Sequence, residues 1–148
     1  MSNFQKASSW NDIAGNKSPS VPTFPPKETV DKCIGLLQEE VDELREAIIY
    51  KGLKDVAKEA SDVLFVTYGL CHAFGIDVDR VFHGVHMSNM TKFCAVYSDA
   101  EATVEHYKKK GTECYIEEVD GIFVVKRKSD NKVVKGVRYK PYSMKGVF

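Results

Sequence analysis

The sequence lacks the features that mark a membrane protein, a disulfide scaffold or a strongly basic nucleic-acid binder. Its four cysteines are scattered, and none falls in a CxxC or CxxH spacing, so small buried side chains in a reducing compartment are expected. No apolar run approaches the length of a transmembrane helix or suggests a signal peptide. Lysine plus arginine balance aspartate plus glutamate at 21 each, so no general attraction to nucleic acid or membrane is implied. These absences predict a soluble, cytoplasmic protein.

The length and patterning indicate one mainly α domain. At 148 residues the chain can bury a core without disulfides. Residues 1–92 form the predicted helical core, and residues 93–148 form an extension of the same domain with a helix, a β-hairpin and a basic C-terminal segment. The expected architecture is an antiparallel helical bundle with a small C-terminal β-hairpin appendage.

Helical periodicity, capping residues and glycine stops define the expected helices. Thr23 is a candidate cap for the first long helix, Asp77 for the third, and Ser98 opens a capping-box pattern. Gly52 and Gly75 follow the two first long helices as natural stops. The expected ranges are about 3–14, 27–51, 53–74, 77–90 and 98–111, the second to fourth being the three long helices of the bundle.

The C-terminal third contains strand signals. Residues 113–117 and 122–126 are rich in β-branched and aromatic side chains, and they are joined at Asp120-Gly121, a strong hairpin turn. A third strand is expected at residues 132–134, after the turn at 129–131.

Four carboxylates are the most informative side chains. Glu40 and Glu43 are spaced i,i+3 within one predicted helix, and Glu59 and Asp62 repeat that spacing within the next. Residues three apart are neighbours on a helix surface, so two packed helices would gather all four side chains. Buried carboxylates coexist when they are protonated or bound to a cation, and oxygen ligands suit Mg²⁺ or Mn²⁺. The spacing therefore predicts a metal site.

The apolar pattern places these acids beside the expected core. Each of the two helices carries a stripe of apolar residues spaced three or four apart. Glu40 lies three residues after Leu37 and four before Leu44 of one stripe. Glu59 lies three residues after Val56 and four before Val63 of the other. The alternative is a solvated surface on which Lys54, Lys58 and Arg45 are ordinary ion-pair partners. Two i,i+3 pairs on consecutive helices favour the metal site. The stripe on the first long helix consists of Val30, Cys33, Leu37, Val41, Leu44 and Ile48.

The run Glu39-Glu40-x-x-Glu43, followed after fifteen residues by Glu59-x-x-Asp62, resembles the EExxE…ExxD pattern of the MazG-like all-α nucleoside triphosphate pyrophosphohydrolases. The resemblance continues through 73–77 and 85–92. Residues 132–136 with Tyr139 and Pro141 resemble the C-terminal segment of the phosphoribosyl-ATP pyrophosphohydrolase-like and dimeric dUTPase-like branch. The stretch from about 94 to 131 has no counterpart in the short members.

The resemblance implies a reaction and a site. Members cleave nucleoside triphosphates between the α and β phosphates, giving the monophosphate and pyrophosphate. By analogy Mg²⁺, or Mn²⁺ in its place, would be bound by Glu40, Glu43, Glu59 and Asp62. Glu39 would then be the general base for the attacking water, the alternative being that it is merely solvated. Members also pair their bundles, so a homodimer, or a dimer of dimers, is implied.

Further residues are candidates for substrate binding. Asn89 and Lys92 share a helix face and offer amide and cationic donors to a triphosphate, although Asn89 is equally well interpreted as a helix cap. Lys135 and Tyr139 belong to a segment that either folds over the nucleotide or remains a solvated basic tail. Trp10 and the prolines near Phe24 form either a wall for the base or ordinary core packing.

Two other functions are alternatives to this interpretation. A di-iron carboxylate protein needs Glu-x-x-His pairs, and no acid in this sequence is followed by histidine three residues later. A non-catalytic helical module that contacts nucleic acid through its basic tail is the main alternative. It leaves the acidic pairs unexplained, and five basic residues from Lys132 onward are few for tight binding, so a nucleic-acid partner is not expected.

Overall fold

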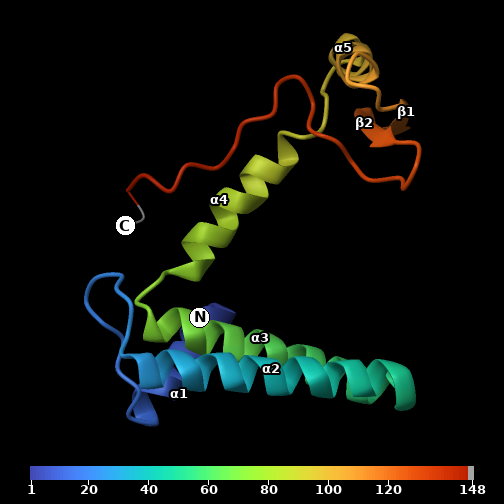
Figure 1. The fold of residues 1–148 in the computed structure, drawn as a ribbon. Coiled ribbons are helices and arrows are strands. Elements are labelled where there is room, and N and C mark those ends of the chain that lie inside the picture. The colour runs from blue at the N-terminus through green and yellow to red at the C-terminus, as the bar shows by residue number, and fades with distance from the viewer. Residues whose placement is uncertain (147–148) are drawn as a thin grey trace. The chain divides into compact units, whose positions relative to one another are not determined.

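The computed structural model of the chain describes residues 1–146, which are mainly helical with one small C-terminal hairpin, as the sequence predicts (Figure 1). The described part forms two compact units, residues 1–80 and residues 81–146. The division predicted from sequence at residue 92 stays a prediction. The elements are α1 (Asn3–Ile13), α2 (Lys27–Tyr50), α3 (Leu53–Ala73), α4 (Val78–Met90), α5 (Tyr97–Lys108), β1 (Cys114–Val119) and β2 (Ile122–Arg127).

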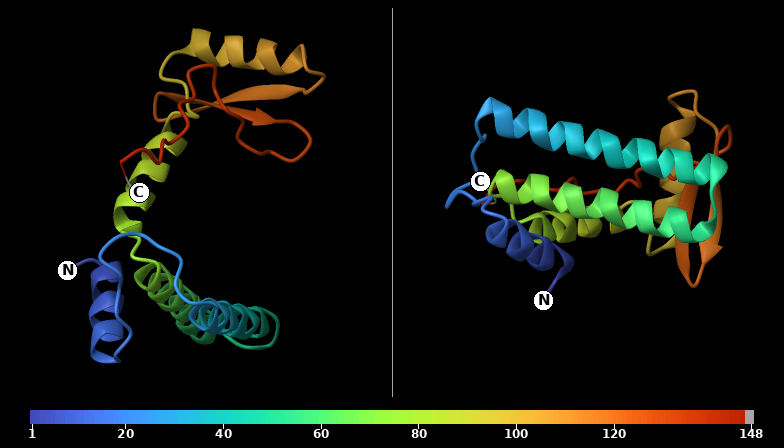
Figure 2. Two further views of the ribbon diagram at one scale, coloured as in Figure 1. Left: turned by 60° about the vertical axis from the view of Figure 1, so that its left-hand side comes forward. Right: turned by 90° about the horizontal axis from the view of Figure 1, so that it is seen from below.

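The first unit is built on a helical hairpin. The two residues Lys51 and Gly52 join α2 to α3, so the two long helices lie side by side and run in opposite directions (Figures 1 and 2). The short helix α1 packs against α3. Three aromatic pairs fasten α1 and the following loop to α3, and their ring centroids are 5.4 to 6.3 Å apart. These pairs are Phe4–Tyr68, Trp10–Phe65 and Phe24–Phe74.

The helix ends confirm one predicted cap and correct another. The carboxylate of Asp77 accepts the Arg80 backbone N–H at 3.1 Å and so caps the start of α4, as predicted. Thr23 does not cap α2, because Pro26 occupies the N-cap position and no side chain caps the helix. The Thr23 backbone N–H donates instead to the carbonyl of Phe74 and ties the loop to the end of α3. A capping box that was not predicted opens α1, where the Ser2 hydroxyl accepts the backbone N–H of Gln5.

In the second unit, α5 lies on the β1–β2 hairpin. The strands pair antiparallel from Cys114 opposite Arg127 to Val119 opposite Ile122, and Asp120 and Gly121 both take the positive φ angles of the predicted turn. The predicted third strand at 132–134 is reduced to one bridge between Lys126 and Val133, because the chain then turns away and Gly136 donates to the Lys92 carbonyl. The buried core comprises Cys94, Ala100, Cys114, Val125 and Val134.

The predicted capping box at Ser98 is wrong. Helix α5 begins one residue earlier, at Tyr97, after an extended Val96, and no side chain caps it. The Asp99 carboxylate instead pairs with Arg138 at 2.6 Å, while the backbone of Cys94 is already paired with Phe123 of the hairpin. The tertiary pairing of the preceding segment therefore decides where this helix starts.

Packing in the first unit leaves apolar surface on α2. The predicted core stripe of this helix is only half-buried at best, and Val41 and Ile48 are exposed. Buried apolar side chains of this unit are small, such as Ala7, Ala47 and Cys71. Because α4 crosses the boundary between the units, its predicted packing in a three-helix bundle stays a prediction.

Over residues 1–146, no helix combines the length and hydropathy needed to cross a membrane.

Candidate metal and nucleotide site

The acidic cluster lies midway along the α2–α3 hairpin. Oxygen atoms of Glu40, Glu43 and Glu59 all lie within 4.8 Å of one another. Glu40 and Glu43 are neighbours one turn apart on α2, and the antiparallel packing of α3 brings Glu59 against them. Glu59 is only 5% exposed, while the other two are partly exposed. The cluster is therefore open to solvent on its α2 side and buried on its α3 side.

Asp62 adjoins this triplet through Lys58. The Lys58 Nζ lies 2.9 Å from a carboxylate oxygen of Glu59 and 2.9 Å from one of Asp62. These contacts raise the pKa of Lys58 above its ordinary value, the hydrogen bond to Asp62 contributing most and that to Glu59 next. An ordinary surface partner is the role of Lys58 in the alternative interpretation, a solvated acidic surface. The structure places its ammonium group directly on two of the four predicted ligands.

The pKa of the Glu40 carboxyl group is shifted by its burial and by the negative charges around it. Its pKa is raised above the ordinary value, chiefly by desolvation and then by the charges of Asp62 and Glu43, with a smaller contribution from Glu39. Lys58 acts in the opposite direction and lowers the pKa. Asp62 is thus within electrostatic range of the triplet even though the three-residue group does not include it.

The donor set suits a hard cation. Three carboxylates that converge within a few ångströms offer several oxygen atoms of high charge density, which is the ligand chemistry of Mg²⁺ and Mn²⁺. Glu59 is buried, and a buried carboxylate needs a compensating positive charge. Glu39 is exposed on the preceding α2 position, four residues before Glu43, so its carboxylate is accessible to water.

A pocket of about 590 Å³ adjoins the cluster along the same helical hairpin. On α2 its lining ends at Leu36, one turn before Glu40, and on α3 it begins at Phe65, one turn after Asp62. Trp10 of α1 also lines it, 56% exposed and in edge contact with the Phe65 ring. Of the candidate base wall, Trp10 and the prolines 25 and 26 therefore line a pocket, whereas Phe24 packs on Phe74.

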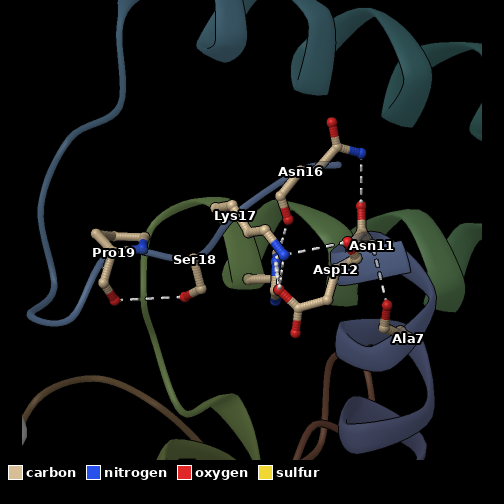
Figure 3. Close-up of polar contacts among 8 residues, drawn as sticks. Ala7, Asn11, Asp12, Asn16, Lys17, Ser18 and Pro19 are labelled. Atoms are coloured by element: carbon tan, nitrogen blue, oxygen red, sulfur yellow. Dashed lines mark hydrogen bonds and ion pairs between the residues drawn. The ribbon is translucent and has the colours of Figure 1, made fainter. Parts of the chain in front are cut away.

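The pocket combines apolar walls with an amide network at one side. The Nδ2 of the buried Asn11 donates to the Ala7 carbonyl at 2.9 Å, and its Oδ1 accepts from Asn16 Nδ2 at 3.1 Å (Figure 3). Gly69 lets Asn11 approach α3, since a Cβ at that position would lie 3.3 Å from Asn11 Nδ2. Burial raises the pKa of the Cys33 thiol, and the charge of nearby Lys32, which also lines the pocket, lowers it.

The predicted substrate-binding residues from 89 onward belong to the second unit. Lys135 Nζ lies 4.7 Å from the centre of the Tyr139 ring, and the Tyr139 hydroxyl is 3.4 Å from Ser88 of α4. The Lys92 carbonyl accepts from Gly136, so the backbone of this segment folds back along the end of α4, while the side chain of Lys135 stays exposed. At the helix end the Thr91 hydroxyl, rather than the Asn89 amide, bonds the last turn.

Comparison with known proteins agrees with the acidic motif. The family profile described as phosphoribosyl-ATP pyrophosphohydrolase matches residues 9–89, more than half of the chain. The chain is also 33% identical over 81 residues to "Uncharacterized protein L479" of Acanthamoeba polyphaga mimivirus; this match covers 55% of the chain and 32% of that relative. The chain thus spans about a third of the length of this curated relative. It belongs to the phosphoribosyl-ATP pyrophosphohydrolase family, and so to a family of nucleotide pyrophosphohydrolases.

Proposed function

We propose that this protein is a Mg²⁺-dependent nucleoside triphosphate pyrophosphohydrolase. It would cleave the α–β phosphate bond of an NTP or dNTP and release the monophosphate and pyrophosphate. The observation that carries the proposal is the convergence of Glu40, Glu43 and Glu59, with oxygen atoms within 4.8 Å of one another, on the helices matched by the family. A triphosphate is a polyanion, so a set of carboxylates can face it only through a cation.

The residues of the cluster then have separate roles. Glu40, Glu43, Glu59 and Asp62 would hold the ion, which when bound supplies positive charge against the phosphate oxygens and orients them for in-line displacement. Glu39 is exposed and adjoins the cluster, so it orients the attacking water and accepts its proton. The buried Glu59 supplies the fixed, desolvated negative charge of the site.

The pocket beside the cluster suits the nucleoside. Its middle, near Cys33 and Gly69, is seven residues from Glu40 and Asp62 respectively, or roughly 10 Å along a helix. That length is comparable to the reach from a base to its α-phosphate. The Trp10 ring offers an aromatic surface, and the Asn16 side chain offers an amide edge to the polar rim of a base. We place the base here, and Asn89, Lys92, Lys135 and Tyr139 remain proposed contacts to the substrate.

A homodimer, alone or as half of a dimer of dimers, is part of the proposal. Ile34, Val41 and Ile48 are exposed at seven-residue spacing along α2, so one face of this helix carries an apolar stripe. Such spacing is complementary to the same stripe on a second copy.

All four cysteines lack a disulfide partner, which supports a reducing compartment such as the cytoplasm.

The test is product analysis with Mg²⁺ and a panel of NTPs and dNTPs. We expect pyrophosphate and the monophosphate, with turnover reduced at least about a hundredfold in Glu40→Gln and in Asp62→Asn. Glu46→Gln is the matched control, since Glu46 is an exposed acid of the same helix that contacts Lys51, and it should retain turnover.

Two outcomes would contradict the proposal. Orthophosphate as the first product would place the cleavage at the wrong bond. Unchanged turnover in both variants would remove the acidic cluster from the mechanism. If no nucleotide is hydrolysed while an oligonucleotide binds with steep salt dependence, the protein is instead a non-catalytic nucleic-acid-contacting module.

A further inference from the structure

Lys58 is the one cation within ion-pair distance of the buried Glu59 in the described part of the chain. Its Nζ is 2.9 Å from Glu59 Oε2 and 2.9 Å from Asp62 Oδ2. The two carboxylates are three residues apart on α3, and Lys58 is adjacent to one and four residues from the other, so one ammonium group spans both. This contact differs from an ordinary ion pair on a helix surface, because the Glu59 side chain is only 7% exposed.

The position of this ammonium group overlaps with that expected for a metal ion. The two oxygens that accept from Lys58 belong to carboxylates that face the same cluster as Glu40 and Glu43. A divalent ion bound there would need those lone pairs and would repel the ammonium charge. The Lys58 ammonium group can move away from the two carboxylates, because the side chain is 64% exposed and its flexible four-carbon stem can extend into water.

We propose that Lys58 is an internal counter-cation that holds the acidic site together before the metal binds and is displaced when it does. This inference rests on the proposed metal site. Without a positive charge, Glu59 would be a buried carboxylate beside two others, so Lys58 stabilises the metal-free fold. For the same reason Lys58 competes with the metal and sets its affinity: the ion must break two ammonium–carboxylate contacts to bind.

The first measurement is metal affinity, with Mn²⁺ titrated into the protein alone and free Mn²⁺ followed by electron paramagnetic resonance. Lys58→Met keeps the length of the side chain and removes its charge. We expect Mn²⁺ to bind about fivefold more tightly to this variant, since the two ion pairs of Lys58 no longer compete with the ion. Lys54→Met is the matched control. It removes the same charge one turn earlier on α3, where no ion pair is formed in the described chain, and should change the affinity less than about twofold.

The second measurement is thermal stability with and without Mn²⁺. The metal-free Lys58→Met protein should melt several degrees below wild type, and the difference should vanish or reverse at saturating Mn²⁺. Lys58→Arg retains a cation and should restore the metal-free melting temperature. A general packing defect at Lys58 would instead lower the melting temperature equally with and without Mn²⁺, which would overturn the inference.

The third measurement tests displacement itself. After brief treatment with an acylating reagent, peptide mapping should show Lys58 modified faster in the presence of Mn²⁺ than in its absence, with Lys54 unchanged. If wild type binds Mn²⁺ and Glu59→Gln does not, the metal site stands; equal Mn²⁺ affinity of wild type and Lys58→Met then contradicts the role of Lys58 alone. If wild type binds no Mn²⁺, the metal site and this inference fail together.

Discussion

Among single residues, Trp10 both packs in the first unit and lines the pocket. One edge of its ring packs on Phe65 and helps to fix α1 on α3, while just over half of its surface remains exposed in the pocket beside the acidic cluster. A ring needed only for the core would be covered by its neighbours. The exposed face is available to a flat ligand such as a nucleobase.

Trp10→Ala should therefore weaken substrate binding more than chemistry. An aromatic surface under a base contributes about 1–3 kcal/mol, so we expect KM to rise about tenfold while kcat stays within about twofold. Steady-state kinetics of pyrophosphate release, well below the melting temperature, measures both. Trp10→Phe should recover most of the loss, and Ile13→Ala, on the same helix but outside the pocket, should behave as wild type. A fall in kcat at unchanged KM would argue against a base at this position.

At the level of elements, the connections position the site as much as the helices do. The turn after α3 is made by Gly75, which has φ +68° and lies against the loop that follows α1. The same loop is tied to α3 by Thr23 N–H to the Phe74 carbonyl and by His72 Nε2 to the Asn16 carbonyl at 2.7 Å. This loop carries Asn16 and the prolines of the pocket wall, so its attachment to α3 holds that wall in place.

Gly75→Ala should destabilise the first unit strongly. A Cβ there would lie 2.9 Å from Pro19 Cγ and 3.0 Å from the Pro19 carbonyl oxygen, in addition to the strain of a left-handed backbone. We expect the free energy of unfolding to fall by about 2–4 kcal/mol. Gly15→Ala separates the two effects, because Gly15 also has positive φ but open space around it, and it should cost about 1 kcal/mol.

Urea unfolding followed by Trp10 fluorescence measures both variants, since this is the single tryptophan of the chain and lies in the first unit. Equal losses in Gly75→Ala and Gly15→Ala would show that backbone strain alone matters and that the contact with Pro19 does not.

For the whole molecule, the apolar surface of the first unit bears on assembly. Its buried apolar side chains are small, while Ile34, Val41 and Ile48 are exposed along α2. A stripe of this kind is costly in water and is a common signature of an interface. Because its members recur every seven residues, two copies of α2 can pack along it.

Ile48→Lys should convert the proposed dimer into a monomer. The side chain is 63% exposed in the single chain, so a lysine is tolerated there by the monomer, whereas two ammonium groups in a self-complementary interface repel each other. Sedimentation velocity at low micromolar concentration distinguishes the two species. Ile13→Lys, at an 86% exposed position of α1, should leave wild-type assembly unchanged. A fully active wild-type monomer would refute the dimer.

Much of the fold could be predicted from local sequence. The long α2 and α3 and the Asp120-Gly121 turn depend on propensity, periodicity and positive φ, which neighbouring residues determine. The errors occurred where a distant segment competes. Thr23 bonds Phe74 and not its own helix, and Val133 makes only one bridge because the following residues turn toward Lys92.

The sequence alone determined that Glu40 shares a helix face with Glu43, and Glu59 with Asp62, because residues three apart are neighbours on a helix surface. Only the tertiary structure decided which oxygens meet: the antiparallel packing of α2 and α3 sets the axial register that brings Glu59 to Glu40 and Glu43. It also decided the role of Lys58. A lysine beside a glutamate is an ordinary surface neighbour until packing buries that glutamate and makes the ammonium its counter-charge.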